Sequence, residues 1–148
     1  MIGRCVPASV FPDARIFAAS EAWLGGDAAR AIRVIDTLRA DGDGPQLVVW
    51  ALADDLHALA AVHAMTARGT PMASALRTIR MWGRRQAALE RAASRVRTQD
   101  VPRWLARLAT IDALSKGIGT GDAWEALQRL ALDIAGPQRR TAALDSPR

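Results

Sequence analysis

The chain has 148 residues, of which 50% are hydrophobic, and its formal net charge is +5. This length fits one domain with a modest core, and the lone Cys5 excludes a disulfide framework. No apolar run approaches the roughly 18 residues that span a bilayer, and the first residues lack the apolar stretch of a secretory signal. We therefore expect a cytoplasmic protein without membrane contact.

The basic excess is carried by arginine, because Lys116 is the single lysine in the sequence. A positive net charge permits an acidic partner but does not demonstrate one. The abundance of arginine and alanine is equally well explained by GC-rich coding. Alanine, leucine and arginine all favour helix, so composition points first to a helical fold.

Helix signals follow one another along the chain with short loops between them. We expect a loose lead-in over residues 1–12, a helical domain over 13–137 and a frayed tail over 138–148. Within the domain, the predicted helices cover about residues 13–24, 28–40, 45–68, 71–78, 80–97, 99–116 and 122–135. No strand-like alternation and no internal repeat occur, so the sequence predicts a compact all-α bundle of about seven helices.

Capping residues and glycines support these boundaries. The predicted N-caps are Asp13, Asp27, Thr98 and Asp122. A Gly25–Gly26 pair, Gly69, Gly117 and Gly136 follow the ends of helices, where glycine is the preferred residue. These signals are local, so they place helix ends without specifying how the helices pack.

The predicted helix over residues 45–68 is the longest and carries apolar groups on two sides. One face comprises Val48, Val49, Leu52, Leu56 and Leu59. Trp50 lies on the opposite side, among alanines and His57. Apolar groups on opposite sides of one helix indicate that it is sandwiched between neighbouring elements.

Residues that would assemble a reactive site are missing from the sequence. There is no phosphate-binding glycine loop ending in Lys-Ser/Thr and no Gly-x-Ser-x-Gly turn. His57 and His63 point about 120° apart on one helix, which disfavours a shared metal, and His63 is interpreted as a core or boundary histidine. Asp54 and Asp55 are interpreted as solvated surface groups. We expect no catalytic, cofactor-binding or metal site, and hence no enzyme.

The segment RMWGRRQAALERAASRVR, residues 80–97, raises the question of nucleic-acid binding. As one helix it would carry a candidate basic stripe formed by Arg80, Arg84, Arg91 and Arg95. Its opposite face would carry Trp82, Leu89, Ala93 and Val96. Arginine suits bidentate contact with phosphate, but no aromatic residue interleaves this stripe to stack on bases. A solvated helix face is therefore favoured over direct DNA contact.

Arg85 is the exception in this segment, because it projects into the apolar face. A guanidinium there is costly unless it meets a carboxylate or helix-end carbonyls, or its charged head reaches past its neighbours to water. Asp112 falls within the apolar arc of the next helix, and we hypothesise that it pairs with Arg85. The alternative is that Asp112 pairs with Lys116, four residues later on the same helix.

Several segments, in this order, resemble the C-terminal domain of the bacterial DNA polymerase III delta subunit, the clamp-loader subunit that opens the sliding clamp. The segments are GDAARAIRVIDTLRADGDGPQLVVWALADDLHALAAVH, RMWGRRQ, IDALSKG and GDAWEALQRLALDIAG. The matching positions are Gly26–Asp27, Arg30, Leu38, Gly44–Pro45, Trp50, Arg80–Trp82, Lys116–Gly117, Trp124 and Leu127–Leu130. Each motif is short, and it is their joint order over about residues 13–137 that carries the resemblance. Met81 departs from the pattern, where valine is frequent.

The resemblance implies a helical collar domain, which holds the clamp loader together through the gamma/tau and delta-prime subunits. It implies contact with the sliding clamp only through AAA+-like domains, which these residues do not resemble. The chain would then be a fragment or a truncated delta subunit, belonging to the DNA-directed DNA polymerase holoenzyme by complex membership. The alternative function is a small helical nucleic-acid-binding protein that uses the arginine stripe.

Interface residues are expected among the large side chains on predicted helices, because tryptophan and arginine are frequent anchors of protein contacts. A core position is the more common one for a single tryptophan on a helix. The candidate core or interface anchors are Trp50, Trp82, Arg85, Trp104, Asp112, Lys116 and Trp124.

Overall fold

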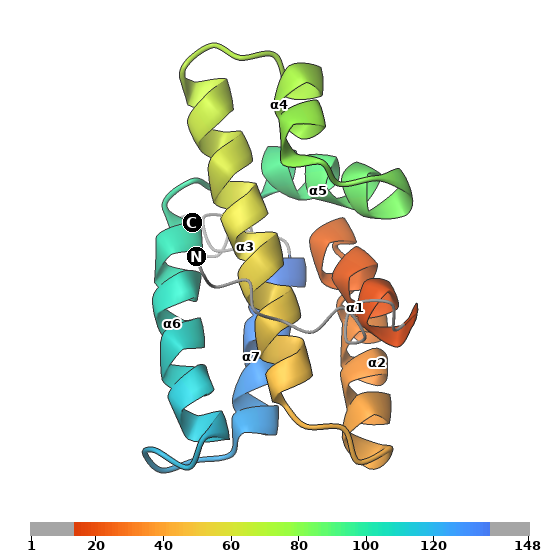
Figure 1. The fold of residues 1–148 in the computed structure, drawn as a ribbon, viewed down its shortest axis with the longest axis vertical. Coiled ribbons are helices and arrows are strands. Elements are labelled where there is room, and N and C mark those ends of the chain that lie inside the picture. Colours follow the sequence, from red (N-terminus) through yellow and green to blue (C-terminus); the bar gives the residue numbers. More distant parts are fainter. Residues whose placement is uncertain (1–13, 137–148) are drawn as a thin grey trace, which may run out of the picture.

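The computed structural model describes residues 14–136, and these form seven α-helices without a strand (Figure 1). The helices are α1 Ala14–Gly25, α2 Ala28–Ala40, α3 Gln46–Ala67, α4 Met72–Ile79, α5 Gly83–Arg95, α6 Asp100–Ser115 and α7 Ala123–Ala135. The predicted all-α bundle is therefore confirmed. The predicted Asp13 cap, Cys5, the lead-in and the tail lie outside the described residues.

The long α3 runs through the centre of the bundle (Figure 1). It packs against α6 on one side and against α1, α4 and α5 on others, while α7 packs against α1, α2 and α6. All members of its predicted apolar face are buried: Val48, Val49, Leu52, Leu56 and Leu59. The apolar groups on two sides of α3 predicted that it lies between neighbouring elements. The structure agrees, because a helix with neighbours on several sides buries more than one apolar stripe.

The length and composition of α3 also meet the criteria for a membrane-spanning helix. An 18-residue window has a mean hydropathy of 1.4, so the expectation that no segment approaches this limit is wrong by this measure. Half of that window is nevertheless buried inside the bundle. Asp54 and Asp55 also lie in this helix, and Asp55 is buried in contact with α1 and α5. We therefore interpret α3 as the central core helix.

The capping residues have mixed outcomes. The Asp27 carboxylate accepts a hydrogen bond from the Arg30 N–H at 3.0 Å, and Asp122 accepts one from the Trp124 N–H at 2.9 Å. The prediction for Thr98 is wrong, because α6 begins at Asp100 and Gln99 occupies the N-cap position without a side-chain hydrogen bond. Gly26, with φ +90°, adopts a conformation that glycine reaches without strain, and it allows the sharp turn from α1 into α2.

The helix predicted over residues 80–97 forms over Gly83–Arg95, so its predicted start at Arg80 is wrong. The chain leaves helical geometry after Ile79, crosses Arg80 to Trp82 and starts a new helix, α5, at Gly83. The break separates the predicted stripe, because Arg80 is not on the helix that carries Arg84, Arg91 and Arg95. It also places α4 and α5 at an angle to each other at one end of α3 (Figure 1).

Candidate subunit interface at the turn between α4 and α5

The turn between α4 and α5 determines which side chains enter the core and which face solvent. Arg80 has left-handed geometry, with φ 62° and ψ 38°, and Trp82 is extended, with φ −118° and ψ 159°. This path turns Met81 inward, where it is 7% exposed, and leaves Trp82 73% exposed. The prediction that Trp82 joins an apolar helix face is therefore wrong, because Trp82 precedes the helix and its direction is set by extended backbone.

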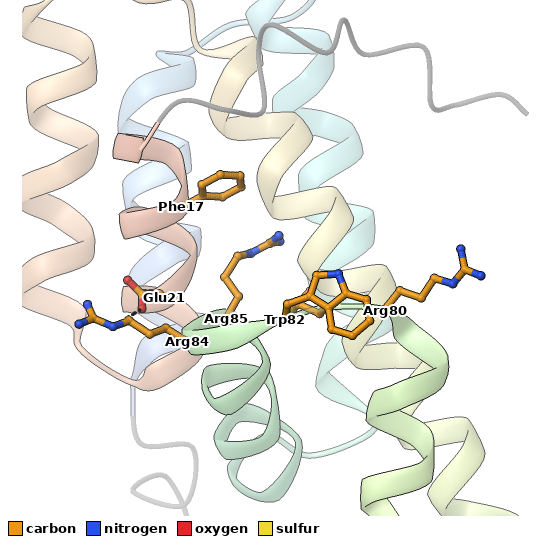
Figure 2. Close-up of a pocket in the computed structure, with 7 residues that line it drawn as sticks. Phe17, Glu21, Arg80, Trp82, Arg84 and Arg85 are labelled. Carbon is orange, nitrogen blue, oxygen red and sulfur yellow. Dashed lines mark ion pairs between the residues drawn. The ribbon is translucent and has the colours of Figure 1, made fainter.

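A hollow of about 430 Å³ lies beside Trp82. It is lined by Phe17 and Glu21 of α1, by Arg80, Met81 and Trp82 of the turn, and by Arg84 and Arg85 of α5. Figure 2 shows Phe17 and Arg85 pointing into the space between α1 and α5, while Arg80 projects away from them. We call this the Trp82 hollow. It combines two partly exposed aromatic rings with basic side chains.

The charges around the Trp82 hollow are unevenly neutralised. Arg84 is 87% exposed, and its Nε lies 3.9 Å from the Glu21 carboxylate, a contact drawn in Figure 2. Glu21 also lies 3.6 Å from Arg30 of α2, so it is shared between two guanidinium groups. Arg80 is exposed and forms no ion pair with another residue in the 14–136 range. The rim therefore carries a net positive charge.

Arg85 has a different role, because it forms a buried ion pair below the hollow. Its Nη2 donates to Oδ1 of Asp55 at 2.6 Å, and its Nε donates to the Ser20 hydroxyl at 3.0 Å. The Ser20 hydroxyl and the Trp23 indole N–H both donate to Oδ2 of Asp55. Three helices, α1, α3 and α5, thus converge on one carboxylate that is 1% exposed.

The electrostatics of this network reflect its burial. Burial raises the pKa of the Asp55 carboxyl above its ordinary value of 3.8, and the neighbouring Arg85 charge opposes that rise. The three groups that contact the Asp55 carboxylate, from Ser20, Trp23 and Arg85, all donate hydrogen bonds to it. This arrangement favours the ionised form of the carboxyl. The Arg85 guanidinium also lies over the Phe17 ring, 5.5 Å from its centroid, a cation–π distance.

This network corrects two predictions about carboxylates. Asp55 is not a solvated surface group but the buried partner of Arg85. The hypothesised Arg85–Asp112 pair does not form, because Asp112 lies on α6 and its carboxylate accepts from Lys116 at 3.0 Å and from Gln46 at 3.3 Å. The alternative pairing of Asp112 with Lys116 is the one observed. Of the outcomes expected for Arg85, the carboxylate partner is the one observed, and Asp55 supplies it.

Arg95 is not a surface member of a phosphate-binding stripe. Its Nη1 donates to the carbonyls of Ile134 and Gly136 at 2.7 and 2.9 Å, and its Nη2 donates to the Leu24 carbonyl at 3.0 Å. The same guanidinium therefore caps the ends of both α1 and α7, where helix carbonyls are unpaired. Burial, with a smaller effect from Arg91, lowers the pKa of Arg95.

The predicted tryptophan anchors separate into core and surface. Trp104 is buried, Trp124 packs half-buried against the core, and Trp50 is half-buried on α3. Trp82 is the exposed member of the set. Trp23, which the sequence did not single out, is fully buried and belongs to the Asp55 network.

The two histidines are separated as predicted. His63 is buried, and its Nε2 lies 3.1 Å from the Ala93 carbonyl of α5. His57 is exposed and lines a second hollow of about 290 Å³ that shares Arg80, Met81 and Arg85 with the Trp82 hollow. Among residues 14–136, no group of three or more histidine, cysteine or acidic side chains is arranged to hold a metal ion.

Comparison with known proteins adds no family to this picture. No protein-family model matches the sequence, and a search of curated proteins finds no match to it. The delta-subunit resemblance therefore rests on the short ordered motifs alone.

Proposed function

We propose that this chain is an assembly module, the C-terminal collar domain of a clamp-loader delta subunit of the bacterial DNA polymerase III type. In this role it joins gamma/tau and delta-prime subunits in the cytoplasm during DNA replication. The domain itself performs no catalysis, and its link to DNA polymerase activity is membership of the complex. Contact with the sliding clamp is assigned to AAA+-like sequence that these residues do not resemble.

The observation that carries this proposal is the exposure of Trp82. Several residues behind the resemblance have roles inside the fold: Asp27 caps α2, Asp122 caps α7 and Lys116 pairs with Asp112. Trp82 has no comparable role, because 73% of it faces solvent. A tryptophan flanked by arginines is a frequent anchor of protein contacts, and an assembly module needs such a surface.

The proposal is tested by reconstitution with gamma/tau and delta-prime subunits. The wild-type domain is expected to enter a complex of defined mass with them, as measured by light scattering after size exclusion. The Trp82→Ala variant is expected to weaken that association, while Ile118→Ala, at an exposed apolar residue of the α6–α7 loop, leaves it unchanged. Wild-type protein that remains free of both partners would refute the proposal.

A second candidate is binding of single-stranded nucleic acid, now centred on the turn rather than on a helix stripe. Trp82 is exposed between Arg80 and Arg84, so it provides the aromatic group that the predicted stripe lacked. Stacking on an aromatic ring beside basic groups is a common mode of single-strand binding. Salt-dependent binding of an oligonucleotide, lost in the Arg80→Glu/Arg84→Glu double variant, would favour this candidate.

A further inference from the structure

The floor of the Trp82 hollow is apolar while its rim is basic. Met81 is buried beneath it, and the rings of Phe17 and Trp82 are partly exposed at its side. The hollow is open to solvent, and its volume of about 430 Å³ is large enough to accept an apolar side chain. An occupant must therefore present an apolar group to the floor, because water contacts with these rings are unfavourable.

The arginines beside the hollow indicate which residues should flank that apolar group on the occupant. The Arg85 charge is balanced by Asp55, whereas Arg80 is unpaired within residues 14–136 and Arg84 has only the distant, shared Glu21. Two weakly neutralised arginines therefore lie at the edge of the hollow, and the side chain of Arg80 extends outward from it (Figure 2). They favour carboxylates on the occupant and disfavour a second copy of this face, which would bring the same arginines together.

Arg80 ends α4 in left-handed geometry, with its backbone N–H donating to the Arg77 carbonyl, a position that glycine usually occupies. Arg80 is the one non-glycine residue with positive φ in the described part of the chain. Left-handed geometry strains a residue with a β-carbon, and glycine avoids that strain. An arginine at a position where glycine is preferred, without an ion pair to another residue of 14–136 and at the edge of a hollow, is consistent with a binding role for its side chain.

We propose that the Trp82 hollow binds an acidic peptide segment of a partner protein, with one apolar side chain inserted between Phe17 and Trp82. Aspartate or glutamate residues on both sides of that anchor contact Arg80 and Arg84. The Asp55–Arg85 pair holds α5 against α3, and the contacts of Arg85 with Ser20 and Phe17 hold α5 against α1, which carries the Phe17 ring. The apolar floor between two aromatic rings favours a peptide side chain over a nucleic-acid base, which needs only one exposed ring face.

This inference extends the proposed function by naming the chemistry of the partner segment. It rests on the part of that proposal that makes this face a protein contact. The identity of the complex is not required. If reconstitution with clamp-loader subunits fails and peptide binding succeeds, only the assignment to the clamp loader is lost.

The test is selection from a random 12-residue peptide library displayed on phage, with the purified domain as target. The expected result is enrichment of peptides with an aromatic or branched apolar residue flanked by acidic residues. A synthetic peptide of the enriched type should bind the wild type at least tenfold more tightly than the Arg80→Glu/Arg84→Glu variant. Arg33→Glu/Arg129→Glu, with two other exposed arginines reversed, serves as the control of equal charge and should bind as the wild type does.

Three results would overturn the inference. The first is no enrichment over the Arg80→Glu/Arg84→Glu variant used as target. The second is enriched peptides that keep their affinity when their acidic residues become Asn and Gln. The third is tighter, salt-dependent binding of a 12-residue oligothymidine to the same arginines, which would assign the surface to nucleic acid.

Discussion

The Arg85 guanidinium of α5 lies 2.6 Å from the Asp55 carboxylate of α3, at a point where Ser20 and Trp23 of α1 also converge. This pair connects the interior of the bundle with the candidate interface, because Arg85 lines the Trp82 hollow while Asp55 is buried. A charged group in the core is maintained only while its partner is present, so the pair makes the position of α5 sensitive to a single contact.

Removal of Arg85 should therefore be costly. In Arg85→Met, the Asp55 carboxyl is left buried without a counter-charge, and we expect the free energy of unfolding to fall by about 3–5 kcal/mol. Arg84→Met, one residue earlier and largely exposed, should change it by less than about 0.5 kcal/mol. Adding Asp55→Asn to Arg85→Met should recover part of the loss. Urea denaturation measures all three variants, and equal stability of Arg85→Met and Arg84→Met would contradict the buried pair.

The same variant should have a distinct pH dependence. Burial already raises the pKa of Asp55 in the folded protein, and loss of Arg85 removes the main opposing effect, so that pKa rises further. A group with a higher pKa in the folded than in the unfolded state favours folding below the unfolded value. It loses that contribution as pH rises through the folded value. Stability of Arg85→Met should thus fall more steeply than wild type from about pH 4 upward.

The matched control for the pH experiment is Arg85→Met/Asp55→Asn, which lacks the titrating carboxyl. Urea denaturation across this pH range should return a profile without the extra slope. A profile that keeps the slope in the double variant would place its origin in another group.

Arg95 should stabilise the bundle through helix ends rather than through a surface charge. Arg95→Ala removes hydrogen bonds to carbonyls at the ends of α1 and α7, and we expect a loss of about 2–3 kcal/mol in the free energy of unfolding. Arg91→Ala, one turn earlier on α5, is the comparison and should cost little, because its charge opposes that of Arg95. Equal losses in the two variants would argue against the capping role.

Truncation of Trp82 and truncation of Trp104 should change the free energy of unfolding by very different amounts. Trp82→Ala should leave the unfolding free energy within about 0.5 kcal/mol of wild type, whereas Trp104→Ala should lower it by about 3–5 kcal/mol. Their exposures, 73% and 4%, are the physical reason. Thermal and urea denaturation provide the measurement, and a large loss for Trp82→Ala would show that the fold requires this ring.

Arg80→Gly should separate stability from binding. Glycine adopts the left-handed geometry of this position without strain, so we expect the variant to be more stable than wild type, by up to about 1 kcal/mol. Its binding of the selected acidic peptide should be weaker. Lower stability of the variant would contradict the strain at Arg80. Unchanged peptide affinity would remove Arg80 from the proposed site.

Helix positions and buried faces were largely predictable, because they depend on local patterns. The five apolar residues of the α3 face repeat at helical spacing, and Asp27 and Asp122 precede their helices at the capping position. The need of Arg85 for a polar partner was also predictable, since it follows from the cost of an apolar environment, although a carboxylate was one of several possible partners.

The partner of Arg85 was not predictable from the helical wheel. A wheel gives the direction of a side chain on its own helix and contains no information on which helix lies opposite. Either Asp112 or Asp55 could have been the partner by sequence. Because α5 packs against α1 and α3, Arg85 lies next to Asp55 of α3. The adjacent Asp54, which does face solvent, made Asp55 resemble a surface residue.

The exposure of Trp82 had a signal in the sequence that helical periodicity concealed. Gly83 lies inside the predicted helix, and a glycine there costs about 1 kcal/mol relative to alanine. In the structure Gly83 has φ 64° and marks the start of a new helix. A break at this glycine would have removed Arg80 from the stripe and Trp82 from the apolar face.

The most direct test of the account is hydroxyl-radical footprinting of Trp82 in the domain alone and in the complex reconstituted with gamma/tau and delta-prime subunits. The buried Trp23 provides an internal reference of low reactivity in both states. We predict that Trp82 is readily oxidised in the free domain and strongly protected in the complex, while Ile118 keeps its reactivity. Trp82 that is oxidised equally in both states would contradict its role as the assembly contact.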